Sequence, residues 1–298
     1  MADRLDRYQG IVDGKARARF LQADLDAKLR SAERLSSPCR LCERGCGAER
    51  NAKKKGVCGV LEPMISSEFL HFGEEPELVP SHTVFFAGCT FKCVFCQNWD
   101  ISQDPGAGRP IPPEDMAMRI ESGGGINVNW VGGDPTSNLT YVIRVMSAMR
   151  KRGINKAQVW NSNMYLSREA MGVLDGVIDV YLGDFKYGND DCARRLSGVE
   201  RYWDVVTRNH TLAAAQCEIL LRHLVMPGHI ECCTKPVLDW VAENIPIEVL
   251  RVNVMDQYHP DHLVLKDKDR FRELARPLRP SEYLEAFEYA RKLGLDLV

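Results

Sequence analysis

The stretch GCTFKCVFCQNW, residues 88–99, holds three cysteines within eight positions: Cys89, Cys93 and Cys96. Three thiolates in the order Cys-x3-Cys-x2-Cys can bind three irons of a [4Fe–4S] cube and leave the fourth iron without a protein ligand. That iron is then open to a small molecule, whereas a fourth cysteine would saturate the cluster, as in an electron carrier. The spacing of this cysteine triplet alone leaves one alternative open, a zinc ion whose fourth ligand comes from elsewhere in the chain.

A second set of cysteines precedes the triplet. Cys39, Cys42, Cys46 and Cys58 follow the order Cys-x2-Cys-x3-Cys-x11-Cys. Four thiolates can close a tetrahedral zinc site or bind a saturated iron–sulfur cluster. The lysines at positions 53–55 would offset the charge of four thiolates. The sequence therefore predicts one further metal site, with zinc and iron–sulfur both open, and unligated structural thiols as the alternative.

Several other cysteines and histidines show no ligand spacing. The cysteines outside the two sets are Cys192, Cys217, Cys232 and Cys233. We assign them no chemistry, because buried thiols are common in protein cores. The histidines for which we predict no role are His82, His229 and His262.

Composition narrows the class of protein. Lys and Arg total 39 against 41 Asp and Glu in 298 residues, and no long run of one sign indicates a nucleic-acid or membrane partner. Eleven cysteines, mostly clustered, favour metal binding in a reducing compartment over disulfides. The N-terminus lacks the apolar segment of a signal peptide, and no window approaches 18 apolar residues. We therefore predict a cytoplasmic protein.

The elements that must position these residues follow a regular alternation beyond residue 78. Six short apolar runs, TVFFAG, NVNWVGG, AQVWNSN, VIDVYLGDFKY, EILLRHLVMPG and IEVLRVNVM, alternate with helical patterns, the first three near 113–122, 137–152 and 167–175. Such βα units form a parallel sheet with right-handed crossovers, and six of them predict an α/β fold, a partial (β/α)6 barrel of the TIM type. Residues 1–77 are expected to form a helical lead-in and a cysteine-rich metal-binding extension, and 78–298 the barrel.

Several motifs, in order, resemble the radical S-adenosylmethionine (SAM) superfamily. Besides the cysteine loop, WVGGDP resembles its Gly-Gly-Glu-Pro turn, GDFK the Asp-x-Lys element of activating enzymes for glycyl-radical enzymes, and LLRHLVMPGH the Arg-then-Val-x-Pro-Gly strand of the same group. With VWNSNMY and VMDQYHP, residues 36 to about 295 look like the proteins related to pyruvate formate-lyase activating enzyme. Reactive residues are then expected at the carboxyl ends of the barrel strands.

The resemblance implies a site around the triplet, with the amino and carboxylate groups of SAM on the fourth iron. Phe95, just before the third cysteine, would shield the cluster and stack on a ligand. Gly132 and Gly133 would let the backbone approach the SAM amino group. Asp134 stands where the family has Glu, which shortens this acceptor by one methylene. Asn163 is a candidate for ribose or carboxylate contacts.

Charged residues at later strand ends complete the implied ligand site. Asp184 would accept from the SAM amino group, and Lys186 and Arg222 would neutralise the carboxylate as point charge and fork. Gln257 and Tyr258 would lie near the adenosine or the substrate entrance.

The activity implied by the resemblance is reductive cleavage of SAM at a [4Fe–4S] cluster. The products are methionine and a 5′-deoxyadenosyl radical that abstracts hydrogen from unactivated carbon. Such an enzyme needs an electron donor such as flavodoxin or ferredoxin. A glycine on a partner glycyl-radical enzyme is one candidate substrate, and a small molecule or a peptide is an equal contender. A non-catalytic iron–sulfur electron-transfer or redox-sensing protein is the third hypothesis, and it leaves Asp184, Lys186 and Arg222 without a use.

Overall fold

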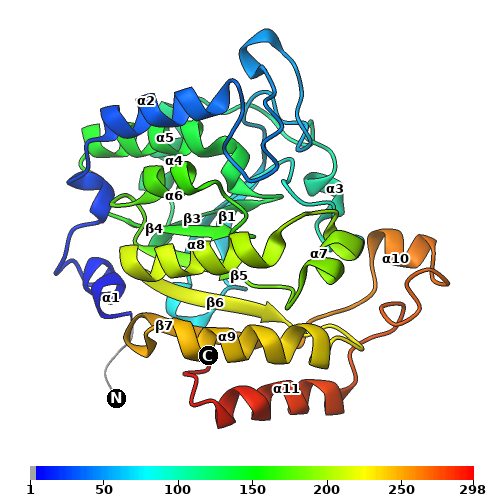
Figure 1. Ribbon diagram of the computed structural model, residues 1–298. Helices are drawn as coiled ribbons and strands as arrows, with labels where there is room; N and C mark the ends of the chain where they lie inside the picture. Colours follow the sequence, from blue (N-terminus) through cyan, green and yellow to red (C-terminus); the bar gives the residue numbers. More distant parts are fainter. Residues whose placement is uncertain (1–4) are drawn as a thin grey trace.

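The computed structural model in Figure 1 describes residues 5–298 and contains one open sheet. Its seven strands are hydrogen-bonded in chain order: β1 (Ile65–His71), β2 (Ser81–Phe86), β3 (Asn127–Gly132), β4 (Ala157–Ser162), β5 (Val180–Asp184), β6 (Glu218–Leu224) and β7 (Leu250–Met255). Strands β2 to β7 are parallel and correspond to the six predicted strands. The prediction of an α/β partial barrel is confirmed.

Helices surround the sheet (Figure 1). They are α1 (Asp6–Val12), α2 (Leu25–Ser36), α3 (Trp99–Ser102), α4 (Pro113–Ser122), α5 (Leu139–Lys151), α6 (Arg168–Leu174), α7 (Asp190–Ser197), α8 (Tyr202–Gln216), α9 (Lys235–Asn244), α10 (His262–Lys266) and α11 (Pro280–Lys292). The expected helices near 113–122, 137–152 and 167–175 are α4, α5 and α6. Among the described residues, no helix has the length and apolar character needed to cross a membrane.

Local chemistry explains where several of these elements begin. Every residue of β4 is buried, as expected for a central strand covered on both faces. The Ser167 hydroxyl accepts from the Ala170 amide and caps α6. Asn189 caps α7 in the same way by accepting from the Cys192 amide. The carboxyl ends of the parallel strands are thereby followed by short, ordered loops in which functional side chains are held in place.

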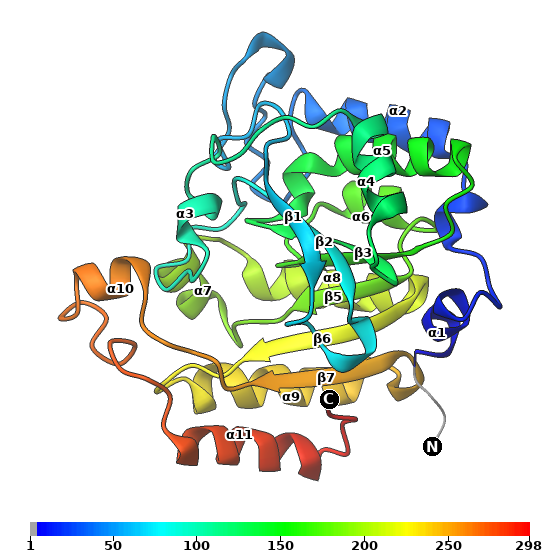
Figure 2. The same cartoon turned by 180° about the vertical axis from the view of Figure 1, so that it is seen from behind.

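The N-terminal third packs directly on the barrel. Helix α2 contacts α5 and α6, and the two blue and green helices lie side by side in Figure 1. Strand β1 pairs antiparallel with β2, from Ile65 opposite Phe86 to His71 opposite Ser81 (Figure 2). Strand β1 lies within residues 1–77 but belongs to the same sheet as β2 to β7. The sheet therefore includes residues on both sides of the predicted division at residue 78. Positions 1–4 of that predicted lead-in lie outside the described residues.

Candidate functional site

The carboxyl ends of the strands surround a cavity of about 460 Å³. The predicted site residues that line it are Cys89, Phe95, Cys93, Cys96, Gly132, Gly133, Asn163, Asp184, Lys186, Arg222 and Gln257. They come from the carboxyl-terminal parts of six different strands and from the loops that follow them, so only the parallel register brings them together. The volume is in the range of ordinary small-molecule sites.

In the triplet, Cys89 is buried and Cys93 and Cys96 are half-buried, and each thiol has a polar neighbour. The Cys93 sulfur lies 2.9 Å from the Ser197 hydroxyl, and the Cys96 sulfur lies 3.2 Å from the Ser102 hydroxyl. The Phe91 amide donates to the Cys89 sulfur over 3.3 Å. These hydrogen-bond donors are suited to thiolates that ligate a metal, because they tune the charge on sulfur. Neither serine was predicted from the sequence.

Burial controls the ionisation of these thiols. It raises the pKa of Cys93 to about 11, with the neighbouring Cys96 adding to the effect, and raises the pKa of Cys89 still further. At neutral pH both groups therefore keep their protons unless a cation is bound beside them. Three thiols around one cavity, one buried and two half-buried, fit the irons of a cluster, which would stabilise them as thiolates.

Gly132 and Gly133 form the turn after β3. Gly132 has φ +122°, and a Cβ there would collide with the Phe86 backbone, while a Cβ on Gly133 would collide with the carbonyl of Gly88. Glycine is thus required by the close approach of the β2 and β3 ends, independent of any ligand. The sequence predicted glycine at these positions to give the SAM amino group access to the backbone. The structure adds a second reason, the close packing of the two strand ends, which the sequence did not reveal.

Asp134 lies behind the cavity rather than in its lining. Its carboxylate accepts from the backbone amides of Thr136, at 2.9 Å, and Asn163, at 3.1 Å. Burial raises the pKa of Asp134 to about 6. The Asn163 side chain in turn donates to the Thr90 hydroxyl at 2.8 Å. The shorter acid therefore connects two strand-end turns, and its expected contact with the SAM amino group has no support in this arrangement.

Asp184 and Lys186 form an ion pair at the end of β5. The Lys186 Nζ lies 2.7 Å from Asp184 Oδ2, and both side chains are mostly buried. Burial acts to lower the pKa of Lys186, but Asp184 and Cys93 outweigh it and raise that pKa. Lys186 is therefore a stable cation at the wall of the cavity, close to the triplet.

Arg222 is occupied by two glutamates that the sequence did not single out. Its Nε donates to Glu75 Oε1 at 2.7 Å and its Nη2 to Glu75 Oε2 at 2.6 Å, and it also contacts Glu74. Asn253 donates to the same Glu75 at 2.8 Å. Burial opposes ionisation, yet Arg222 holds the pKa of Glu75 below its ordinary value. The glutamates stand in the connection GEEPELVP, whose sequence shows only a Pro-containing linker.

Phe95 and the loop after β7 form one rim of the cavity. The rings of Phe95 and Tyr258 have centroids 5.9 Å apart. Tyr258 donates its hydroxyl to the Leu274 carbonyl and is outside the lining, whereas Gln257 lines the cavity and accepts from Gln97 through its carbonyl. The aromatic contact thus holds the third-cysteine end of the loop against the C-terminal segment.

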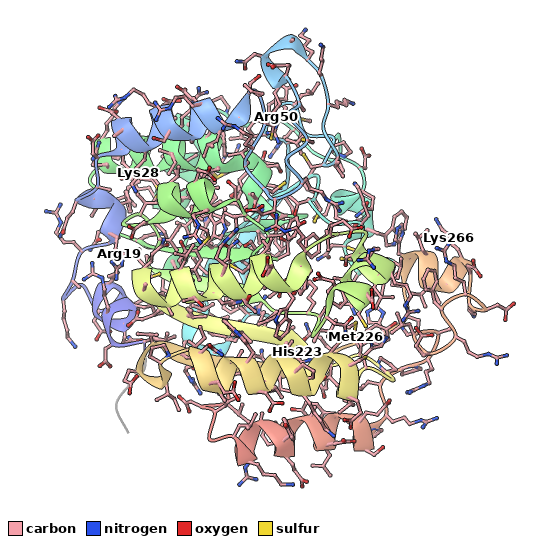
Figure 3. The ribbon with its side chains drawn as sticks, in the orientation of Figure 1. Arg19, Lys28, Arg50, His223, Met226 and Lys266 are labelled. Carbon is pink, nitrogen blue, oxygen red and sulfur yellow. The ribbon has the colours of Figure 1, made fainter. Side chains whose placement is uncertain are left out.

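The N-terminal cysteines face a second, smaller cavity. Cys39, Cys42, Cys46 and Cys58 all line it. Arg50 reaches this set, with Nη2 3.5 Å from the Cys58 sulfur; it is labelled at the base of the N-terminal loop in Figure 3. The lysines 53–55, expected to offset the thiolate charge, are exposed, and Arg50 is the cation in contact.

This loop is fastened to the triplet. The Arg44 Nε donates to the carbonyl of Thr90, the residue after Cys89, at 2.9 Å, and the Glu43 amide donates to the Tyr165 carbonyl at 3.2 Å. The cysteine-rich segment therefore packs against the loop that carries the triplet.

The residues without a predicted role behave in two ways. His82 lies 3.1 Å from Glu68, His262 stacks on Trp99, and Cys217 is buried away from other sulfurs. In contrast, the structure brings four others together: Cys192, His229, Cys232 and Cys233. The segment HIECC, residues 229–233, was the available signal, since it places three possible metal ligands within five positions.

Comparison with protein families gives one match. A family model described as the radical SAM superfamily matches residues 83–241, which include the cysteine triplet and the ends of β2 to β6.

Individual proteins and solved structures are also similar to this chain. An uncharacterized protein of Methanocaldococcus jannaschii is 45% identical over 282 residues, which cover 92% of this chain and 80% of that protein. The pyruvate formate-lyase 1-activating enzyme of Escherichia coli is 26% identical over 152 residues, or 48% of this chain and 60% of the enzyme. Among solved structures, Streptococcus suis SuiB bound to S-adenosylmethionine has a TM-score of 0.49 at 14% identity, covering 70% of this chain and 47% of that one.

Proposed function

The chain belongs to the radical SAM superfamily, and from this premise we propose that it cleaves S-adenosylmethionine reductively at a [4Fe–4S] cluster bound by the cysteine triplet. One observation carries the proposal. Three thiols, one buried and two half-buried, with no fourth cysteine in the lining, share a cavity of about 460 Å³ with a glycine turn and a mostly buried lysine. Such a cavity suits a cluster with one open iron and a small organic ligand.

The chain's own residues would hold and shield these groups. Cys89, Cys93 and Cys96 would each ligate one iron, with the Ser197 and Ser102 hydroxyls donating to two of the thiolates. When bound, the cluster and SAM supply one-electron reduction of a sulfonium and a carbon radical that abstracts hydrogen. Cys89 is buried and Cys93 and Cys96 are half-buried, so their surroundings would limit the access of water to the bound groups.

We assign the contacts with SAM to polar groups at the strand ends that face the cavity. Lys186 faces the cavity as a cation and is our choice to neutralise the SAM carboxylate. Asp184 beside it, and the backbone of the Gly132–Gly133 turn, would accept from the amino group. The Arg222 guanidinium already donates two hydrogen bonds to Glu75. We therefore propose that Arg222 positions Glu75 and, through it, Asn253, and that it makes no direct contact with the ligand.

The test is production of 5′-deoxyadenosine. The protein is reconstituted anaerobically with iron and sulfide and incubated with dithionite and SAM. We expect 5′-deoxyadenosine from the wild type and from Cys217→Ala, a buried thiol outside every cluster, and none from Cys93→Ala. A cluster-loaded wild type that makes no 5′-deoxyadenosine would overturn the proposal and favour the electron-transfer or redox-sensing alternative.

For the hydrogen donor we propose a glycine Cα on a partner protein. The likeness to pyruvate formate-lyase activating enzymes supports this, although it covers about half of the chain. Deuterium transfer from a labelled glycine peptide into 5′-deoxyadenosine checks it, with labelled metabolites as the comparison. Transfer from a metabolite alone would replace the protein substrate with a small molecule. Flavodoxin or ferredoxin is the proposed electron donor, tested by replacing dithionite with each reduced protein.

We propose a second metal centre at the N-terminal cysteines. Their sulfurs share a cavity but do not form a group with the close spacing of ligands on a single ion, which favours a polynuclear iron–sulfur cluster over zinc. Iron and sulfide counts on wild type and Cys42→Ala test this. We expect the variant to lose one cluster and to retain SAM cleavage, because the triplet is intact.

A further inference from the structure

Four potential metal ligands converge beyond the end of β6, and none of them lines the triplet cavity. Cys192 comes from α7, and His229, Cys232 and Cys233 come from the segment that joins β6 to α9. Their ligand atoms all lie within 4.8 Å of one another, and within residues 5–298 this is the one group of its kind. His229 and Cys233 are buried, and the other two are half-buried.

The distances within the group match those around one tetrahedral ion. The Cys232 sulfur lies 3.9 Å from the sulfurs of both Cys192 and Cys233. The Nδ1 atom of His229 lies 3.7 Å from Cys192, 3.3 Å from Cys232 and 3.7 Å from Cys233. Ligands of zinc, with bonds of about 2.3 Å to sulfur and 2.0 Å to nitrogen, lie about 3.8 Å apart as sulfur pairs and about 3.6 Å apart as sulfur–nitrogen pairs.

The far side of the histidine ring is also arranged for a ligand role. Glu273 Oε1 lies 3.8 Å from His229 Nε2 and 2.6 Å from the Arg195 guanidinium, which itself lies 3.3 Å from Nε2. With Nδ1 on a metal, Nε2 keeps the ring proton and can no longer accept from Arg195. Glu273, already paired with Arg195, would then have to move closer than 3.8 Å to accept from Nε2 and complete a carboxylate–histidine–metal arrangement, which orients the ring.

Side-chain hydrogen bonds hold α7, which carries Cys192, close to the 229–233 segment. Asn189 accepts from the Cys192 amide at 2.8 Å and donates to the Cys232 carbonyl at 2.7 Å, so one side chain connects them. His223, labelled near the end of β6 in Figure 3, bridges the Phe185 carbonyl and the Thr234 hydroxyl in a second connection. Residues Ile230–Thr234 form a single π-helical turn, a rare conformation that often occurs at functional sites.

Other uses of three thiols fit less well. A disulfide needs sulfurs about 2.05 Å apart, and the measured pairs are at 3.9 Å. A [4Fe–4S] cluster places each thiolate on its own iron and therefore holds the sulfurs farther apart than ligands of one ion. Three thiolates and one imidazole are instead a common ligand set for structural zinc, with all four coordination positions filled by protein.

We propose that Cys192, His229, Cys232 and Cys233 bind one zinc ion in a closed structural site. Binding is not a redox step: the thiols release their protons to solvent as the sulfurs bond to zinc. The ion would join α7 to the β6–α9 connection. Ser197, the last residue of α7, contacts the Cys93 sulfur, so this crosslink would also steady one wall of the triplet cavity.

Metal counting tests the site. Wild type, Cys232→Ser and Cys217→Ser are purified anaerobically from zinc-containing medium, and zinc per chain is measured by mass spectrometry. Cys217→Ser is the matched control, because that thiol is buried and touches no other sulfur in the described residues. We expect Cys232→Ser to contain one zinc fewer than wild type and Cys217→Ser to equal wild type. Equal zinc in all three proteins would overturn the proposal.

X-ray absorption on the wild type gives a second answer that does not depend on the folding of a variant of the proposed site. We expect an imidazole nitrogen in the zinc shell together with sulfur. The N-terminal cysteines and the triplet contain no histidine, but His71 lines the triplet cavity, so the imidazole signal is assigned to the proposed site when it persists in Cys93→Ser, which lacks a ligand of the triplet. Zinc bound by sulfur alone, or no zinc, would contradict the assignment. Neither measurement involves SAM, so failure here leaves the proposed cleavage reaction standing, and failure of that reaction leaves this site standing.

Discussion

The triplet loop and the Cys192 site, defined as Cys192, His229, Cys232 and Cys233, use the same thiol chemistry in opposite ways. The triplet lies within eight consecutive positions, and its sulfurs do not form a closely spaced group. The Cys192 site joins two separate βα connections, and its ligand atoms lie within 4.8 Å of one another. A spread, incomplete set leaves a coordination position for a ligand, whereas a compact, complete set closes around one ion.

The surroundings of the triplet and of the Cys192 site also differ in how open they are to a ligand. The triplet opens on a cavity whose wall carries the Lys186 cation. The residues of the Cys192 site do not line the triplet cavity, and Glu273 and Arg195 lie beside its histidine. We take the first region to be reactive and the second to be structural. The number of cysteines alone would not have separated the two regions, because each offers three.

The largest expected effect separates the two regions by activity. Cys96→Ala should reduce 5′-deoxyadenosine production to background, because two thiolates cannot hold the cluster. Cys192→Ser should retain a measurable rate, because its thiol does not face the triplet cavity. The measurement is chromatographic quantification of 5′-deoxyadenosine in the presence of dithionite and SAM. Loss of product in Cys192→Ser at full cluster content would end the distinction between reactive and structural regions.

The second effect concerns the ion pairs of Arg222 with Glu74 and Glu75 in the wall of the triplet cavity. Arg222→Met would leave Glu74 and Glu75 buried without their cation, and we expect a loss of about 3–5 kcal/mol in the free energy of unfolding. Urea unfolding under anaerobic conditions measures it. The control is Arg201→Met, because Arg201 pairs with Asp204 on the surface and such pairs contribute about 1 kcal/mol or less. Similar losses in the two variants would mean that the buried network does not support the cavity.

Metal removal gives the third effect. Chelation of the proposed zinc should lower the stability by about 3 kcal/mol, or the thermal midpoint by roughly 5–10 °C. Hydrogen exchange should accelerate in α7 and in the π-helical turn Ile230–Thr234, but not in α5, which is distant in the chain and packs against α2 and α4. The same chelator should cause no such change in Cys232→Ser. An identical change in that variant would place the affected metal elsewhere.

The smallest effect tests the connection between the regions. Ser197→Ala removes a hydroxyl 2.9 Å from the Cys93 sulfur, an interaction of about 1 kcal/mol. Because hydrogen bonds to cluster thiolates stabilise the reduced state, the midpoint potential should become more negative. Redox titration followed by electron paramagnetic resonance measures it. Ser147→Ala on α5, whose hydroxyl bonds to Ile143, is the control; an equal shift there would remove the assigned role of Ser197.

Much of the barrel was predictable because its signals are local. Alternating apolar runs and helical patterns located all six parallel strands and helices α4, α5 and α6. The residues at the strand ends, such as Lys186 and Gly133, then had to meet, since parallel strands place their carboxyl ends at one edge. Strand β1 was missed because its seven residues, ISSEFLH, are half-polar and stand inside a segment dominated by cysteine spacing.

Partners far apart in the chain were not predictable. Nothing local in GEEPELVP indicates that Glu75 would meet Arg222, 147 residues later. Asp134 matched a binding motif by position, but its carboxylate caps two neighbouring turns. Side chains choose among competing donors and acceptors only after the backbone has brought those groups within reach.

The sequence by itself determined the open barrel, the cysteine triplet and the family to which the chain belongs, because periodicity and short motifs are written in consecutive residues. Only the tertiary structure decided which charges pair with Arg222, where Asp134 lies, and that Cys192 meets His229, Cys232 and Cys233. The physical reason is that a ligand set or a buried ion pair is defined by distances of a few ångströms, and those distances arise only when separate βα units pack on one another.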